Sequence, residues 1–350
     1  MYSEQDLRDA VAAGAISDQA ADALRNHVST VRRSPAVDEE NFRLVSSFND
    51  IFVTIAAVLL LVAMAGIGSA TAPGLGGLLV AGAAWGMAEY FTRQRRMALP
   101  SIVLLLAFVG GLVAAPIEVI DHAARDGLDD RVAAVILSGA FLLGAVGAWL
   151  HWRRFHVPIT VAAGAATVAG TAIALIVAAT GMTGEAAQDL VLGLVFAAGL
   201  AIFAYAMRWD MSDRARETRR SDVAFWLHLL AAPMIAHPIF HLLGVTDGGN
   251  IGSGAAVLVI GVYILFGLIA LAIDRRALLV SALAYVLFAM TQLFRTFGAV
   301  ELNVALTAFV IGSALLTLSA FWTRIRSGLV RQLPGEWQAR LPVAGAMAAA

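Results

Sequence analysis

Long runs of apolar residues, separated by short polar segments, make up most of this chain after residue 48. A helix needs about 20 mostly apolar residues to cross the hydrocarbon core of a bilayer. Ten windows of the sequence have that character. They are Ile51–Ser69, Leu75–Phe91, Ser101–Ile120, Val132–Trp152, Ile159–Thr180, Leu190–Met207, Val223–Leu243, Ala255–Ile273, Leu278–Phe297 and Val304–Trp322. The pattern predicts an all-α fold, a polytopic transmembrane helix bundle of about ten spans.

The first 48 residues have a different pattern, with apolar positions at helical spacing in a polar sequence of mixed charge. Gly14 ends a first predicted helix, and Ser17 caps a second one. The apolar face of the second helix carries Leu24, Val28 and Val31. We therefore expect three regions. They are a helical hairpin and linker at 1–48, a transmembrane domain at 49–323 and a tail at 324–350.

The composition supports a membrane protein and excludes several other classes. Hydrophobic residues make up 60% of the chain and charged residues 14%, against about 45–50% and 25% in soluble domains. The absence of cysteine excludes disulfides, iron–sulfur clusters and cysteine-ligated zinc. The first 40 residues hold more acidic residues than arginines, so they lack the basic face that binds nucleic acid. The expected partners are the lipid bilayer and a cytoplasmic protein at the hairpin.

Arginine is distributed unevenly among the connections between the predicted spans. Every second connection is basic, and those between are neutral or acidic. The side that holds both termini carries 21 Arg and 16 acidic residues, whereas the opposite side carries 3 Arg and 9 acidic residues. Because basic residues are retained on the cytoplasmic side of membrane proteins, we expect both termini to lie in the cytoplasm.

Polar and ionisable residues occur near the predicted outer ends of the third, seventh and ninth spans. We call them the outer polar set: Glu118, Asp121, His122, His237, His241, Gln292, Arg295 and Glu301. At about 100° per residue, the first three share one helix face, and the two histidines lie one turn apart. His228 lies on the opposite side of its helix from His237, so the set does not include it.

Three interpretations of the outer polar set remain open. The residues could form an interfacial network of ion pairs, because charge is tolerated at helix ends. They could line a pocket for a small solute or ion, where histidine titrates near neutrality and Arg295 holds an anion. A metal site is the third interpretation, with Glu118, His122, His237 and His241 as ligands from two helices. The sequence predicts no other cofactor.

Known catalytic motifs are missing from the sequence. It contains no HExxH and no GxSxG, so we predict no catalytic residue and do not favour an enzyme. Movement or sensing of a small solute or ion through the outer polar set is the leading hypothesis. The alternative is a non-catalytic scaffold that docks a cytoplasmic partner through its hairpin.

Small residues within the spans predict close contacts between helices. They occur at Gly82–Gly86, at Gly110-Gly111 with Ala114, and at Ala140–Gly144. A local ion pair is also expected, because Glu89 lies one helical turn before Arg93.

The segment Leu7–Ala20 has the sequence Leu-Arg-Asp-Ala-Val-Ala-Ala-Gly-Ala-Ile-Ser-Asp-Gln-Ala. It resembles the N-terminal helical hairpin of a broad group of bacterial multi-pass membrane proteins, in which a Gly-Xaa-Ile-Ser turn joins two helices before the spans. That group is defined by a domain of unknown function. The resemblance implies a bacterial inner-membrane location and no particular activity, so it assigns no role to any residue.

Overall fold

The computed structural model describes residues 4–32, 48–125, 127–214, 216, 218–245, 252–296 and 302–342. The chain divides into two compact units, Met1–Arg43 and Leu44–Ala350. All regular elements in these described ranges are helices. The all-α fold class is therefore confirmed.

The first unit contains two helices, α1 (Glu4–Ala12) and α2 (Asp18–Arg32). Gly14 adopts a left-handed backbone with φ 70°, which ends α1. The hydroxyl of Ser17 accepts a hydrogen bond from the amide of Ala20 at 3.2 Å, so the predicted cap of α2 is confirmed. Leu24 is 42% exposed on α2. The side chains of Val28 and Val31 lie outside the described residues.

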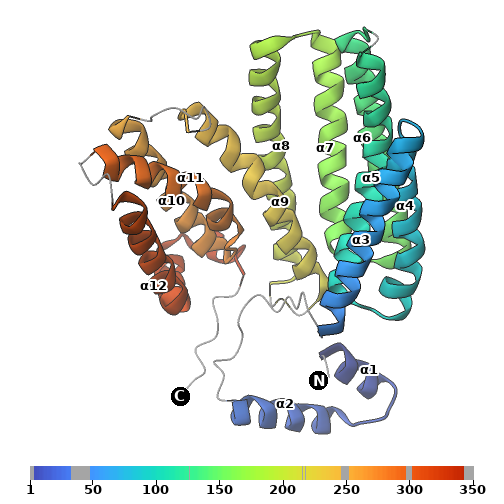
Figure 1. The fold of residues 1–350 in the computed structure, drawn as a ribbon. Helices are drawn as coiled ribbons and strands as arrows, with labels where there is room; N and C mark the ends of the chain where they lie inside the picture. Colours follow the sequence, from blue (N-terminus) through green and yellow to red (C-terminus); the bar gives the residue numbers. More distant parts are fainter. Residues whose placement is uncertain are drawn as a thin grey trace. The chain divides into compact units, whose positions relative to one another are not determined.

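The second unit is a succession of long apolar helices (Figure 1). In chain order they are α3 (Phe48–Thr71), α4 (Leu75–Ala88), the π-helix η1 (Glu89–Gln94), α5 (Ala98–Ala124), α6 (Asp130–Phe155), α7 (Ile159–Thr180), α8 (Gly184–Ser212), α9 (Arg219–Leu242), α10 (Ser253–Ile273), α11 (Ala277–Thr296), α12 (Asn303–Gln332) and the short α13 (Gly335–Gln338). Nine helices of the described chain are long and apolar enough to cross a membrane. The second predicted span is α4, which has 14 residues and continues directly into η1.

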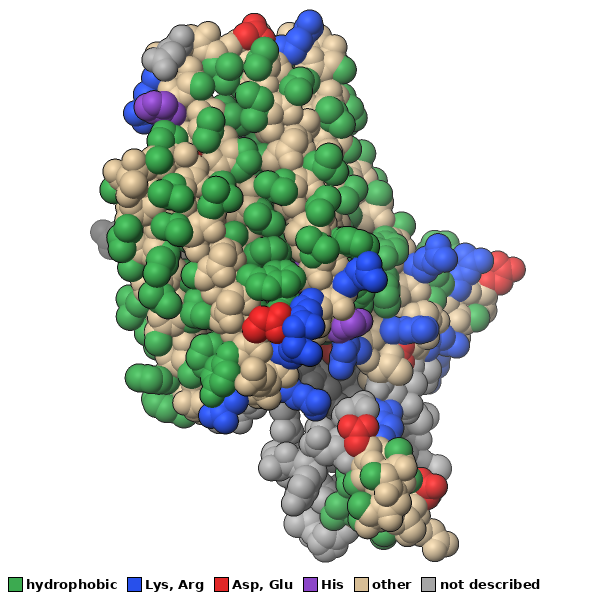
Figure 2. Space-filling view, turned by 90° about the vertical axis from the view of Figure 1, so that its right-hand side faces the viewer, with side chains coloured by type: hydrophobic (Ala, Val, Ile, Leu, Met, Phe, Trp, Pro, Cys, Tyr) green, Lys and Arg blue, Asp and Glu red, His purple; other side chains and the backbone are tan. Residues whose placement is uncertain are grey.

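The surface of this unit is that of an integral membrane protein. Large apolar side chains are exposed along the helices, among them Leu59, Leu142 and Leu316. Figure 2 shows hydrophobic side chains over most of one face, while arginines gather towards one end of the helices. We call it the arginine-rich end. Water would make such an apolar surface unstable, whereas lipid solvates it, so the unit is a multi-pass membrane domain.

Small residues set the closest helix contacts, although not at every position predicted. A Cβ added at Gly111 of α5 would lie 2.5 Å from the carbonyl oxygen of Gly77 in α4, and one at Gly144 of α6 would lie 2.6 Å from Val113. These contacts confirm close packing at both places. At Gly82 and Gly110 the same addition meets nothing within 4 Å. Gly86 is equally open, so the two glycines of Gly82–Gly86 make no close helix contact, although Ala84 between them is fully buried.

Helix neighbours organise the domain around α9. Consecutive helices pack in pairs, α4 with α5, α6 with α7, α8 with α9 and α10 with α11. Helix α9 also contacts α7 and α11, so it joins the earlier helices to the later ones (Figure 1). Its central residues are fully buried, including Leu227 and Ala231. Helix α12 extends beyond the predicted boundary at residue 323, to Gln332.

Candidate functional site

Glu118, the first member of the outer polar set, binds the turn between α3 and α4. One carboxylate oxygen accepts a hydrogen bond from the hydroxyl of Ser69 at 3.0 Å, and the other accepts one from the amide of Gly74 at 2.9 Å. Gly74 has a left-handed backbone with φ 82°, which favours glycine. Both oxygens of Glu118 therefore act in closing this turn.

We expect replacement of Glu118 by alanine to destabilise the domain. The amide of Gly74 and the hydroxyl of Ser69 would lose a charged acceptor, which costs roughly 1–3 kcal/mol. Thermal unfolding in detergent would measure the loss. Asp121→Ala is the matched control, because Asp121 lies on the same helix and is exposed. Equal melting temperatures for the two variants would contradict a capping role for Glu118.

Of the two histidines of α9, His237 interacts with α11 instead. The Nδ1 atom of His237 lies 2.7 Å from the hydroxyl oxygen of Tyr285. The rings of His237 and His241 are 6.4 Å apart between centroids. Tyr285 also stacks on Phe240, with ring centroids 4.5 Å apart. This pair of helices therefore has its own polar contact at the end remote from the arginine-rich end.

Three of the remaining members of the outer polar set lie at the surface. Asp121, His122 and Arg295 are exposed. The side chain of Gln292 and the whole of Glu301 lie outside the described residues. In the described ranges, no three His, Asp or Glu residues are grouped so that they could hold a metal ion. The four ligands of the metal interpretation therefore do not form such a group.

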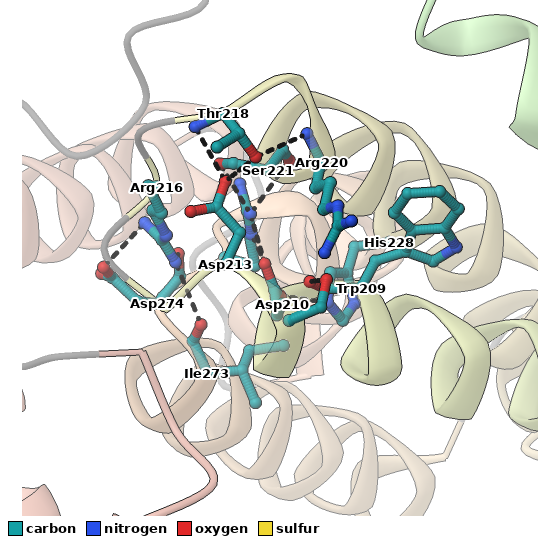
Figure 3. A network of polar contacts seen from close by, with 12 residues as sticks. Trp209, Asp210, Asp213, Arg216, Thr218, Arg220, Ser221, His228, Ile273 and Asp274 are labelled. Carbon is teal, nitrogen blue, oxygen red and sulfur yellow. Dashed lines mark hydrogen bonds and ion pairs between the residues drawn. The ribbon is translucent and has the colours of Figure 1, made fainter.

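A larger concentration of buried charge lies at the arginine-rich end of the second unit (Figure 3). It joins α8, α9, α10, α12 and the connections between them. We call it the charged cluster, and it consists of Asp210, Arg216, His228, Asp274, Arg275 and Arg326. Burial of these groups in a membrane domain is costly unless they are paired.

Asp210, near the end of α8, has a basic partner on each side. Arg275 donates to one carboxylate oxygen at 2.6 Å, and the Nε2 atom of His228 lies 2.9 Å from the other. Because a carboxylate only accepts, Nε2 carries the ring proton. Arg275 donates a further hydrogen bond to the carbonyl of Ser221 at 3.2 Å. A single carboxylate thus connects α8, the first three turns of α9 and the α10–α11 turn.

Asp274, in the turn after α10, is the second acidic centre. Arg216 donates to it at 2.9 Å, the indole of Trp322 donates at 2.7 Å, and Arg326 lies 3.5 Å away. Arg326 also donates to the carbonyl of Pro342 at 2.8 Å. This group therefore fixes α12 and the segment after it to the α10–α11 turn.

The backbone at this second centre is strained on both sides of the ion pair. Arg216 has φ 56° and Asp274 has φ 60°, a region that costs non-glycine residues about 1 kcal/mol or more. Burial lowers the pKa of Arg216, and the charge of Arg275 lowers it further, whereas Asp274 opposes both effects. Asp213 accepts hydrogen bonds from the amide and hydroxyl of Thr218, at 2.9 and 2.6 Å, and so holds the connection that carries Arg216.

Burial determines what this cluster can do chemically. The side chain of Asp210 is 0% exposed, that of Arg275 2% and that of Arg216 10%. Their charges are used in pairing within the protein, so the cluster holds helix ends together. One ring atom of the cluster, Nδ1 of His228, is buried without a hydrogen-bond partner among the described residues.

Sequence reasoning missed this cluster, although a signal was present. The arginines of the α8–α9 and α10–α11 connections fitted the charge bias, and His228 was excluded because it faces away from His237. The signal was the presence of two acidic residues, Asp210 and Asp274, within arginine-rich segments. Glu89 likewise has a partner on another helix that its local sequence did not reveal. Its predicted pair with Arg93 is present at 3.4 Å, but Arg154 of α6 binds it more closely, at 2.8 Å.

Comparisons with protein-family models, with curated proteins and with solved structures find no match to this chain. The functional interpretation therefore rests on the site itself.

Proposed function

We propose that this chain is a bacterial inner-membrane scaffold whose arginine-rich end faces the cytoplasm and whose N-terminal hairpin docks a protein partner there. The observation that carries the proposal is the paired, buried charge of Asp210, Arg275 and Asp274. It fixes the ends of α8 to α12 to one another at the arginine-rich end. Such an arrangement suits a rigid platform, because its ionic groups are engaged with one another.

The separation of the hairpin supports docking. Residues Met1–Arg43 form a compact unit of their own, and Leu24 is exposed on α2. An exposed leucine on an amphipathic helix is a usual anchor for a partner groove. The resemblance of Leu7–Ala20 to the hairpins of bacterial membrane proteins agrees with the proposed location.

Docking is tested in cells with a photo-crosslinking amino acid at position 24. We expect one discrete adduct. The same amino acid at Asp22, also exposed on α2, is the matched control, because it lies about 160° away around the helix. Adduct yields that are equal at the two positions, or zero at both, would count against a docking face.

The orientation has its own test, which the absence of cysteine makes simple. We expect Asp129→Cys, at the start of α6, to react with a membrane-impermeant maleimide in intact spheroplasts. Arg95→Cys, before α5, should react only after lysis. Basic residues stay on the cytoplasmic side, so the opposite labelling would invert the proposed orientation.

Sensing or movement of a small solute or ion is the second candidate. It is favoured by one observation, the exposed His237 that contacts Tyr285 across α9 and α11. Intramembrane histidines often belong to ion pathways. Proteoliposomes that contain the chain would be tested for uptake of a small solute or ion. Uptake would favour this candidate over the scaffold if it is lost in His237→Ala and retained in Asp121→Ala.

A further inference from the structure

An open groove lies between α6, α7 and α8, towards the arginine-rich end. Its volume is about 310 Å³. Trp149, Trp152, Tyr205 and Trp209 line it, and Trp149 is 54% exposed. Tryptophan and tyrosine favour the boundary between hydrocarbon and headgroups, so the groove has the character of a site at that depth.

The groove exists because small residues leave space beneath these rings. Ala148 of α6 and Gly164 of α7 both line it. A Cβ added at Gly164 would meet only the Cβ of Ala148, at an ordinary 3.6 Å. The lining continues along α7 from Thr160 to Val168, which corresponds to about 12 Å of helix. An extended hydrocarbon chain of about ten carbons has roughly that length.

Positive charge lies beside the groove. The guanidinium of Arg153 lies 4.9 Å from the centre of the Trp149 ring. Arg208 lies one turn from Tyr205 on the same side of α8. Both arginines are exposed, and neither forms an ion pair with any residue that the structure describes. The adjacent Arg154, by contrast, is neutralised by Glu89.

We propose that this groove binds one anionic phospholipid, with an acyl chain against the aromatic lining and the phosphate at Arg153 and Arg208. The ligand must combine a long apolar part with a negative charge at one end, because the groove is apolar along its length and cationic beside its mouth. Basic sites between membrane helices bind anionic headgroups in this way. A second copy of this chain is less suitable, since Glu89, an acidic side chain beside this end of α6, is already bound by Arg93 and Arg154.

The same construction occurs a second time in the domain. A smaller groove of about 140 Å³ lies between α10, α11 and α12, and Trp322 lines it. The guanidinium of Arg276 lies 4.8 Å from the centre of that ring. An arginine over a tryptophan beside an apolar groove therefore recurs at the arginine-rich end, which supports lipid as the common ligand.

Native mass spectrometry of the delipidated full chain tests the first groove. With equal amounts of phosphatidylglycerol and phosphatidylcholine added, we expect one phosphatidylglycerol per chain to be retained, with a preference of roughly ten-fold or more. The double variant Arg153→Ala/Arg208→Ala should lose that preference. Gly164→Leu, which fills the groove, should lose the bound lipid, whereas Gly139→Leu, where a Cβ meets nothing within 4 Å, should retain it.

A second measurement protects the test against misfolding. Phosphatidylglycerol with brominated chains should quench tryptophan fluorescence in the wild type and in Gly139→Leu, and less in Gly164→Leu, all three being monodisperse. Equal retention of the two lipids by the wild type would overturn the proposal. So would lipid binding that is unchanged in Gly164→Leu, or a dimer that this variant alone abolishes.

Discussion

Replacement of Asp210 by alanine is expected to lower the free energy of unfolding by about 3–5 kcal/mol. The variant would leave the buried guanidinium of Arg275 without its carboxylate, and the Nε2 proton of His228 without an acceptor. Neither side chain reaches solvent, since both are 2% exposed. The loss would appear as a lower melting temperature of the detergent-solubilised protein and as faster loss of the monodisperse form on heating.

Two further variants separate the ion pair from a general effect of mutation. Asp189→Ala removes an exposed aspartate at the other end of α8 and should leave the melting temperature within the usual range for surface changes. The double variant Asp210→Leu/Arg275→Met removes both charges, so it should be more stable than Asp210→Ala. A double variant no more stable than the single one would contradict a dominant role for the unpaired guanidinium.

The second large effect is expected for Gly111→Ala in α5. Its Cβ would lie 2.5 Å from the carbonyl oxygen of Gly77 and 2.9 Å from the amide nitrogen of Ala81. Both are backbone atoms, so no side-chain rotation relieves the overlap and α4 must move away from α5. Overpacking of this kind costs about 1–3 kcal/mol or more, and membrane helices depend on such close approach for their association.

The adjacent glycine supplies the control for this prediction. A Cβ at Gly110 meets nothing within 4 Å, and alanine favours the helix over glycine by up to about 1 kcal/mol. We therefore expect Gly110→Ala to keep or raise the melting temperature, while Gly111→Ala lowers it. Variants that melt alike would show that α4 and α5 do not meet at Gly111.

The two effects concern different parts of the membrane domain. Gly111 lies where α4 and α5 approach each other, and Asp210 lies where α8 meets α9 and the α10–α11 turn. Packing in the first region uses small residues, because lipid offers no hydrophobic drive for helices to associate. Attachment in the second uses ion pairs that are excluded from water. Loss of either feature should therefore separate a different set of helices.

The outer polar set illustrates the limit of reasoning from helix faces. Glu118 and His237 were placed at similar depth from the sequence, and each has a polar contact, but with different neighbours. Glu118 contacts the α3–α4 turn, whereas His237 contacts Tyr285 of α11. Helical periodicity gives the side of a helix on which a residue lies. It does not give the helix that packs there.

The sequence by itself determined the class of protein, the approximate number of spans, the helical hairpin and the alternation of arginine between connections. These properties follow from runs of about 20 neighbouring residues, since transfer of a helix into lipid depends on its own composition. Only the tertiary structure decided that Asp210 meets His228 and Arg275, and that Gly111 rather than Gly110 contacts α4. Such contacts depend on the rotation of each helix about its axis and on its choice of neighbour, which local hydrophobicity leaves undetermined when every face of a helix is apolar.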